Sequence, residues 1–193
     1  MERILTFAKL MVTLTGDSDI DCSNKQLTSL EGAPKEVRWN FNCSNNILTT
    51  LEGCPVGDYI NINCSHNKLI SLNGAPQIVG DFDCSGNQLT SLQGSPIEVE
   101  ANYNCSHNRL SSLEDAPVFV TGDYNCSGTQ LTSLVGAPRE VRNFDCSNNS
   151  LPSLAGCPDE VTGDFICRDN FELFTEEDVR EACNVKGRVI TGG

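Results

Sequence analysis

Residues 143–156 read NFDCSNNSLPSLAG, a stretch in which one cysteine stands between an aspartate and a serine, with an asparagine three residues later. Such a group of side chains is compatible with a nucleophile or a metal ligand. The same wording, however, returns as DFDCSGNQLTSLQG at 81–94 and as NFNCSNNILTTLEG at 40–53. A motif that recurs along the chain is better explained by repeated architecture than by chemistry.

Eight cysteines mark the repeat, and they stand 20 or 21 residues apart. In six of the eight copies asparagine follows the cysteine by three residues, and in seven copies leucine follows it by five and again by eight. A turn, usually Gly-small-Pro, then closes the copy. A fixed period of this length predicts stacked coils that bury their apolar side chains against one another. The cysteines are Cys22, Cys43, Cys64, Cys84, Cys105, Cys126, Cys146 and Cys167.

Each copy also holds the pattern of a short strand. An aromatic residue or isoleucine stands two positions before every repeat cysteine, so on an extended chain both side chains point to the same side. The tract from Val141 to Leu154 fits L-x-x-L-x-L-x-x-N-x-L-x-x-L. On these residues the chain resembles the leucine-rich repeat family over roughly residues 15 to 174. The resemblance implies one short strand and one return path per coil, with a parallel sheet on the concave side.

Two details of wording narrow the resemblance. The short period, with a proline three residues before a valine as in Pro138 and Val141, looks like the bacterial subtype of the family. The order Cys-Ser-x-Asn-x-Leu-x-Ser-Leu-x-Gly-Ala-Pro is similar to small repeat proteins encoded by tailed bacteriophages. What this likeness implies is a binding scaffold that blocks or redirects a host protein, such as an antiviral defence protein. It does not name the partner.

We therefore expect an α/β repeat solenoid, a single curved array of eight coils of 20–21 residues with a cap at each end. The expected parts are an N-terminal cap at 1–15, the repeat array at 16–174, and a C-terminal cap helix with a tail at 175–193. At the N-terminus four apolar residues share one helical face and predict a short cap helix: Ile4, Phe7, Ala8 and Met11.

The C-terminal cap has its own signals. Three apolar residues break the repeat register and are expected to cover the last coil: Phe171, Leu173 and Phe174. Thr175, followed by three acidic residues, predicts the start of a helix. The expected apolar face of that helix is Val179, Ala182 and Cys183, with Gly187 ending it. The tail from Val189 is expected to add a short extended piece.

The repeat cysteines and asparagines are interpreted as structural. A cysteine at the same slot of every coil forms a buried ladder of small apolar side chains, and parallel side chains on neighbouring strands are badly aligned for disulfides. An asparagine at each corner is expected to satisfy backbone groups of adjacent coils. Lys25 and Thr129 replace this asparagine in two copies, and the coil at Thr129 is expected to be looser.

The strand positions that point away from the core carry almost only aspartate and asparagine, and they are the predicted partner-binding residues. The row three before each cysteine is Asp19, Asn40, Asn61, Asp81, Asn102, Asp123, Asn143 and Asp164. The row one before each cysteine is Asp21, Asn42, Asn63, Asp83, Asn104, Asn125, Asp145 and Ile166. The serine after each cysteine is expected to be the next outward position. The prediction is an acidic binding face on the concave side.

Two other interpretations of these rows stay open. Within each row no two aspartates occupy adjacent coils, as expected when like charges on neighbouring strands repel, so the rows are also compatible with a merely solvated face. A chain of calcium sites is the third alternative, although the Asp-x-Asp pairs lack the glycine-rich nonapeptide of calcium-binding rolls. Trp39, the only tryptophan, is added as a partner contact because tryptophan is enriched in interface hot spots; the alternative is that it lies flat on a coil edge.

Composition narrows the class of partner. The formal net charge of −13 disfavours nucleic acid and anionic membranes, which need clustered Lys and Arg, and favours a protein partner with a basic surface. Eleven cysteines, an odd number with regular spacing, favour a reducing cytoplasm, which for a phage protein is that of the host. We expect a non-catalytic protein-binding module without cofactor or metal, and we favour a monomer over an oligomer. A virion or adhesin component and a nucleic-acid mimic are the alternatives.

Overall fold

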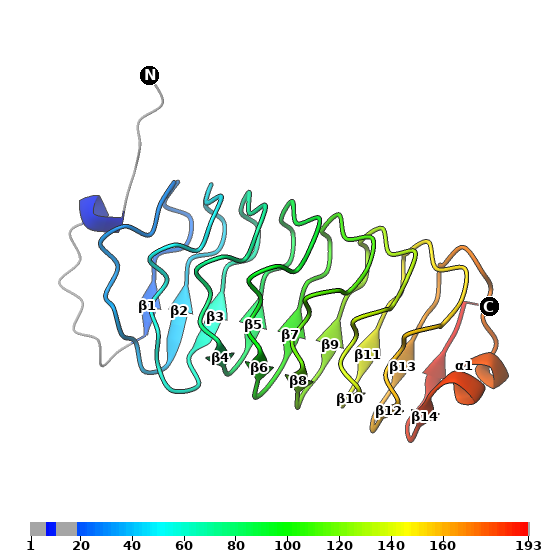
Figure 1. Ribbon diagram of the computed structural model, residues 1–193. Helices are drawn as coiled ribbons and strands as arrows, with labels where there is room; N and C mark the ends of the chain where they lie inside the picture. Colours follow the sequence, from blue (N-terminus) through cyan, green and yellow to red (C-terminus); the bar gives the residue numbers. More distant parts are fainter. Residues whose placement is uncertain (1–6, 11–18, 193) are drawn as a thin grey trace.

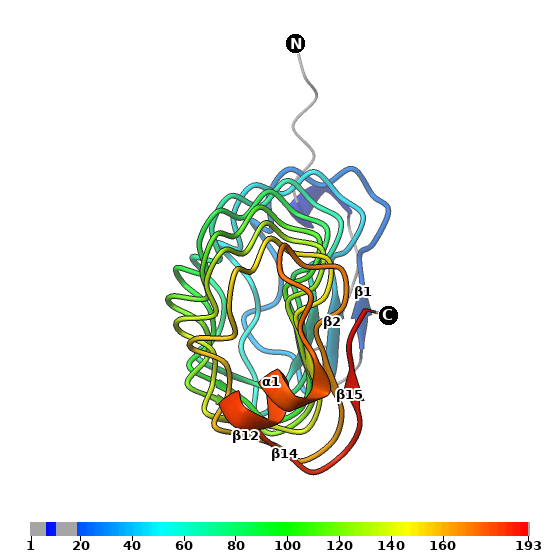
Figure 2. The same cartoon turned by 90° about the vertical axis from the view of Figure 1, so that its right-hand side faces the viewer.

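The computed structural model describes residues 7–10 and 19–192 and shows a parallel β-solenoid (Figure 1). The coils stack side by side in chain order, from the blue end to the red end of the figure. Seen along the stack, they superpose as closed loops with the main sheet on one side (Figure 2). The main sheet has nine strands, and the chain makes eight turns between the first and the last of them, as the eightfold repeat predicts.

The nine-stranded sheet takes one strand from each coil and one from the C-terminal tail. Its order is β1-β2-β3-β5-β7-β9-β11-β13-β15, and all the pairs are parallel. The bounds are β1 Ile20–Asp21, β2 Asn40–Asn42, β3 Asn61–Asn63, β5 Phe82–Asp83, β7 Tyr103–Asn104, β9 Tyr124–Asn125, β11 Phe144–Asp145, β13 Phe165–Ile166 and β15 Val189–Ile190.

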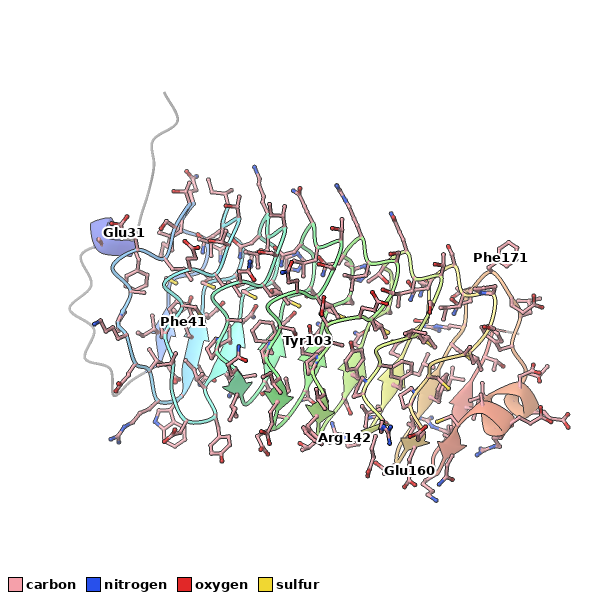
Figure 3. All side chains as sticks on the ribbon, in the orientation of Figure 1. Glu31, Phe41, Tyr103, Arg142, Glu160 and Phe171 are labelled. Carbon is pink, nitrogen blue, oxygen red and sulfur yellow. The ribbon has the colours of Figure 1, made fainter. Side chains whose placement is uncertain are left out.

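Equivalent residues of successive coils lie directly opposite one another, so the core is a set of ladders. The aromatic ladder pairs Phe82 with Tyr103 and Tyr103 with Tyr124 in register, with ring centroids 5.8 and 5.2 Å apart. These distances suit stacked aromatic rings. The repeat cysteines and both leucine rows are buried beside it. Figure 3 shows Phe41 and Tyr103 within the stack.

A second side of the solenoid carries two short three-stranded parallel sheets. Their strands are β4 Ile78–Val79, β6 Glu98–Val99 and β8 Phe119–Val120, then β10 Glu140–Val141, β12 Glu160–Val161 and β14 Asn184–Val185. In each strand the second residue, a valine, is buried. The strands of this side are not joined between β8 and β10, although Val120 and Val141 are 21 residues apart in the sequence, like the paired Val99 and Val120.

The corner asparagines hold neighbouring coils together as expected. Asn87 is 7% exposed, and its Nδ2 donates to the carbonyl oxygens of Cys64, in the preceding coil, and of Cys84 and Ser85 in its own. Its Oδ1 accepts from the backbone N–H of Leu69 at 3.0 Å. Equivalent bonds recur at Asn46, Asn67, Asn108, Asn149 and Asn170.

Thr129 makes a different set of bonds. Its hydroxyl donates to the carbonyl oxygen of Cys126 in its own coil and to Oδ1 of Asn149 in the next. Each corner asparagine also bonds to the preceding coil. Among the described residues, the side chain of Thr129 makes no such bond. The shorter threonine side chain does not reach back to the preceding coil, and the prediction that this coil is tied less firmly rests on that difference.

The described part of the N-terminal cap is a 3-10 helix, Phe7–Leu10. Phe7 is buried, with its ring centroid 6.4 Å from that of Phe41, so it covers the first coils as predicted. Ile4, Met11 and the expected boundary at residue 15 lie outside the described residues.

The C-terminal cap is the helix α1, Glu176–Ala182, followed by β14 and β15, which extend both sides of the solenoid (Figure 2). Thr175 and Asp178 form a capping box at its start, and Val179 is fully buried. Two expectations were wrong. Phe171 and Leu173 are 77% and 75% exposed, so only Phe174 of the three covers the last coil. The helix ends at Ala182, itself exposed, and not at Gly187.

The described helices are both short, and neither has the length and apolar character needed to cross a membrane.

Candidate interaction face

The outward side of the nine-stranded sheet, here called the strand face, carries both aspartate and asparagine rows. The core residue between the two row positions is buried in every coil, for example Phe82 between Asp81 and Asp83, so alternation along the strand turns the rows outward. Their side chains are half-buried or exposed. The serine after the cysteine was expected to point outward too, but five of the serines are buried: Ser44, Ser65, Ser85, Ser106 and Ser147.

The first row is a continuous side-chain ladder. Oδ1 of Asp81 accepts from the backbone N–H of Asn102 at 3.0 Å and from its Nδ2 at 2.8 Å. Oδ1 of Asn102 then accepts from the N–H of Asp123 at 2.9 Å. The same bonds link Asp19 to Asn40, Asn40 to Asn61, Asn61 to Asp81, Asp123 to Asn143, and Asn143 to Asp164. The row is therefore fixed from coil to coil.

The second row ends each strand with a tight bend. The Oδ1 atom of the aspartate or asparagine accepts from the backbone N–H of the serine two residues later, as in Asp83 to Ser85 at 2.9 Å and Asn104 to Ser106 at 3.2 Å. This local bond is one that Asp and Asn side chains favour at turns. It also occurs at Asp21, Asn42, Asn63, Asn125 and Asp145. Ile166 has no side-chain oxygen for this bond.

Two of the seven aspartates are neutralised by arginines that the sequence interpretation overlooked. Arg142 Nε lies 2.7 Å from Oδ1 of Asp123, and this hydrogen bond holds the pKa of that carboxyl below its usual value. Arg188 Nη2 lies 2.6 Å from Oδ2 of Asp164, with the same effect on its pKa. The signal for Arg142 was its position directly before a first-row residue, where every other coil carries an uncharged residue.

Three of the remaining aspartates have no ion pair with an arginine or lysine of the described residues. The ion pairs between described residues reach none of Asp81, Asp83 and Asp145. A hydrogen bond from the backbone N–H of Ser23 holds the pKa of Asp21 below its usual value. A shallow depression of about 260 Å³ lies on this face over β2, β3 and β5, next to Asp81 and Asp83.

Trp39 is largely exposed to solvent. It is 65% exposed, and it lines a hollow of about 1020 Å³ together with Val56 and Tyr59, which is 61% exposed. Its lining residues stand in the sequence between the Gly-small-Pro turns and the first-row residues Asn40 and Asn61, so the hollow borders the strand face. Sequence reasoning found Trp39 by its rarity but missed Tyr59 and Val56, because it examined the strand positions and passed over the residues after the Gly-small-Pro turns.

The cysteines form the buried ladder that the repeat predicts, and all eleven thiols are free. Burial raises the pKa of the repeat thiols, to about 12 at Cys105 and about 11 at Cys167. They are therefore protonated at neutral pH, which makes them poor nucleophiles. Cys157 differs: its pKa is lowered by a hydrogen bond with Cys183, and it is only partly buried. Within residues 7–10 and 19–192 there is no group of three or more His, Cys, Asp or Glu placed to hold a metal.

Comparison with known proteins adds no relative. No protein-family model matches the chain, and neither a curated protein nor a solved structure matches it.

Proposed function

We propose that the protein is a non-catalytic binding module whose strand face docks a protein partner with a basic surface. In this proposal lysines and arginines of the partner meet the carboxylates of Asp81, Asp83 and Asp145. Electrostatic complementarity of this kind accelerates association and selects against acidic partners.

The observation that carries the proposal is charge that the fold does not use. Each of the two rows places one side-chain oxygen acceptor in every coil except at Ile166, and an asparagine supplies it in eight of the sixteen positions. Aspartate does the same work at Asp81, Asp83 and Asp145 with a negative charge that no described ion pair compensates. A merely solvated face would be equally well served by asparagine.

The geometry of the rows supports the proposal in a second way. The aspartate and asparagine side chains of the rows are held by hydrogen bonds to the next coil, to the tail or to their own bend. A partner therefore meets carboxylates whose conformational entropy has already been lost on folding, and docking costs less. Such a preorganised face suits recognition, in which the fixed spacing of the coils selects the spacing of the basic groups.

The finer expectations belong to the same proposal. They are that the coils are leucine-rich repeats, that the strand face is the concave side, and that the protein is a cytoplasmic phage product that blocks or redirects a host protein. They rest on the wording of the repeat. The partner-binding set also keeps Trp39, at the margin of the face.

The proposal is tested by capture with matched charge variants. The parent, the triple variant Asp81→Asn/Asp83→Asn/Asp145→Asn, and the control Glu31→Gln/Glu52→Gln/Glu114→Gln are immobilised, and bacterial lysate proteins are quantified by mass spectrometry. Both variants lose three charges, but the control residues are exposed outside the strand face. We expect a protein retained by the parent and the control and lost by the triple variant. Equal retention by all three forms would refute binding through these carboxylates.

A further inference from the structure

The two short sheets on the second side present one continuous outward row. Register places Ile78 opposite Glu98, and Glu98 opposite Phe119, while the valine that follows each of them is buried. Alternation along a strand therefore turns these three side chains outward. The row continues beyond the break with Glu140 opposite Glu160. Glu160 is visible on this lower edge in Figure 3.

The first half of this side is apolar and the second half is polar. Five large apolar side chains here are between 46% and 62% exposed: Val56, Ile78, Ile97, Val118 and Phe119. We call them the apolar edge. At the same two slots the later coils carry Arg139, Glu140, Asp159 and Glu160. The solenoid thus accepts charged residues at these slots, so the fold itself does not require apolar residues in the first half.

The apolar edge is continued by the hollow at Trp39. Val56 and Tyr59 line that hollow, and Val56 is bridged to Glu36 of the preceding coil. Tyr59 has a φ of 58°, in the left-handed region that a bulky residue enters at a cost. Strained residues of this kind gather at binding sites. Contiguous apolar patches are rare on monomers and mark interaction surfaces.

The charges beside the apolar edge specify the chemistry of what it binds. Glu98 and Glu100 flank the buried Val99, so both carboxylates stand on the same side of β6 at the middle of the edge. The hydrogen bond and repulsion between them raise the pKa of Glu100. No described ion pair provides them with a cation. Two adjacent carboxylates in an apolar surround favour a lysine or arginine of the occupant.

We propose that the apolar edge is a second docking surface, which takes a segment of a partner protein that presents apolar side chains around a central lysine or arginine. This surface lies on another side of the coils, shares only Trp39 with the set assigned to the strand face, and does not depend on the function proposed for that face. A second copy of the chain is the other candidate occupant, and the experiment below distinguishes the two.

A displayed library of random linear peptides tests the proposal. Peptides are selected on the parent and then sorted by their binding to Ile97→Thr/Phe119→Thr and to the control Ile47→Thr/Ile70→Thr. The control isoleucines are also exposed, Ile70 to 61%, but they follow the Asn corner on another side of the coil. Circular dichroism and melting confirm that both variants fold. Affinities are read from the emission of Trp39, the only tryptophan in the chain.

We expect peptides that combine apolar residues with a lysine or arginine, that shift the Trp39 emission to shorter wavelength, and that lose at least about tenfold in affinity on the edge variant but not on the control. Changing their basic residue to glutamate should abolish binding. Three results would overturn the proposal: no edge-dependent peptide, edge-dependent peptides without a basic residue, or edge-dependent dimers of the parent in sedimentation. Loss of binding on the Asp81→Asn/Asp83→Asn/Asp145→Asn variant alone would assign the peptides to the strand face and would also overturn it.

Discussion

The replacement Asn87→Ala tests the corner ladder that joins the coils. It leaves the buried backbone N–H groups of Leu69 and Asn67 without the Oδ1 atom that accepts from them at 3.0 and 3.2 Å. Each unpaired buried group costs about 1–3 kcal/mol, so the free energy of unfolding should fall by about 2–6 kcal/mol. At 7% exposure little water reaches the site to relieve the loss. In a chain of this length the melting temperature falls by roughly 2–4 °C per kcal/mol.

Urea and thermal unfolding followed by circular dichroism measure this loss, with Gln93→Ala as an exposed control in the neighbouring turn that should change stability by less than about 0.5 kcal/mol. The reverse change, Thr129→Asn, supplies the missing bonds and should stabilise the protein by about 1 kcal/mol. The ladder would be refuted if Asn87→Ala melted like the parent, or if Thr129→Asn and Asn87→Ala shifted the melting temperature in the same direction.

Three further predictions concern the buried tyrosines, the cysteines and the ion pair at Asp123. Tyr103 Oη lies 2.9 Å from Ser95 Oγ, whereas Tyr124 Oη is the one buried side-chain oxygen or nitrogen in the described residues without a hydrogen-bond partner. Tyr103→Phe should therefore lower the melting temperature of the protein, and Tyr124→Phe should leave it unchanged or raise it. Ellman's reagent should label Cys157 first in the native protein, spare the repeat thiols, and label all eleven after denaturation; rapid native labelling of many thiols would contradict the buried ladder. Because the pKa of Asp123 is lowered in the folded protein, its ionised carboxylate contributes its full stabilisation above about pH 4 and loses it as the pH falls through the folded-state pKa. Asp123→Asn should therefore make the melting temperature depend less on pH on the acid side.

The repeated positions were predictable because each coil repeats the same local problem. A cysteine, an aromatic residue and two leucines at fixed spacing determine the buried ladders, and an asparagine at each corner is the natural partner for backbone groups that turn away from the sheet. The departures from the period were harder. The spacing of the cysteines does not predict the break between β8 and β10, because strands 20 residues apart pair on this side, as at Ile78 and Glu98, whereas β8 and β10 are 21 residues apart and do not.

The candidate site was predicted in part. Alternation along the strand placed the aspartate and asparagine rows outward, but it said nothing of their bonds to the next coil or of the arginines at Asp123 and Asp164. Those arginines come from other coils and from the tail, so only the register brings them together. The apolar edge was missed because its residues differ from coil to coil, and a search for repeated residues passes over positions that vary.

The most direct test of binding through the strand face is the association rate of the captured partner, measured at several salt concentrations for the parent and for Asp81→Asn/Asp83→Asn/Asp145→Asn. If the uncompensated carboxylates steer the partner, the parent associates faster at low salt and loses this advantage near physiological ionic strength, where charges are screened over about 8 Å. The variant should then associate more slowly, with a shallower dependence on salt and an unchanged melting temperature. Identical rates and salt dependence for the two proteins would contradict binding through these charges and leave the rows with their structural role alone.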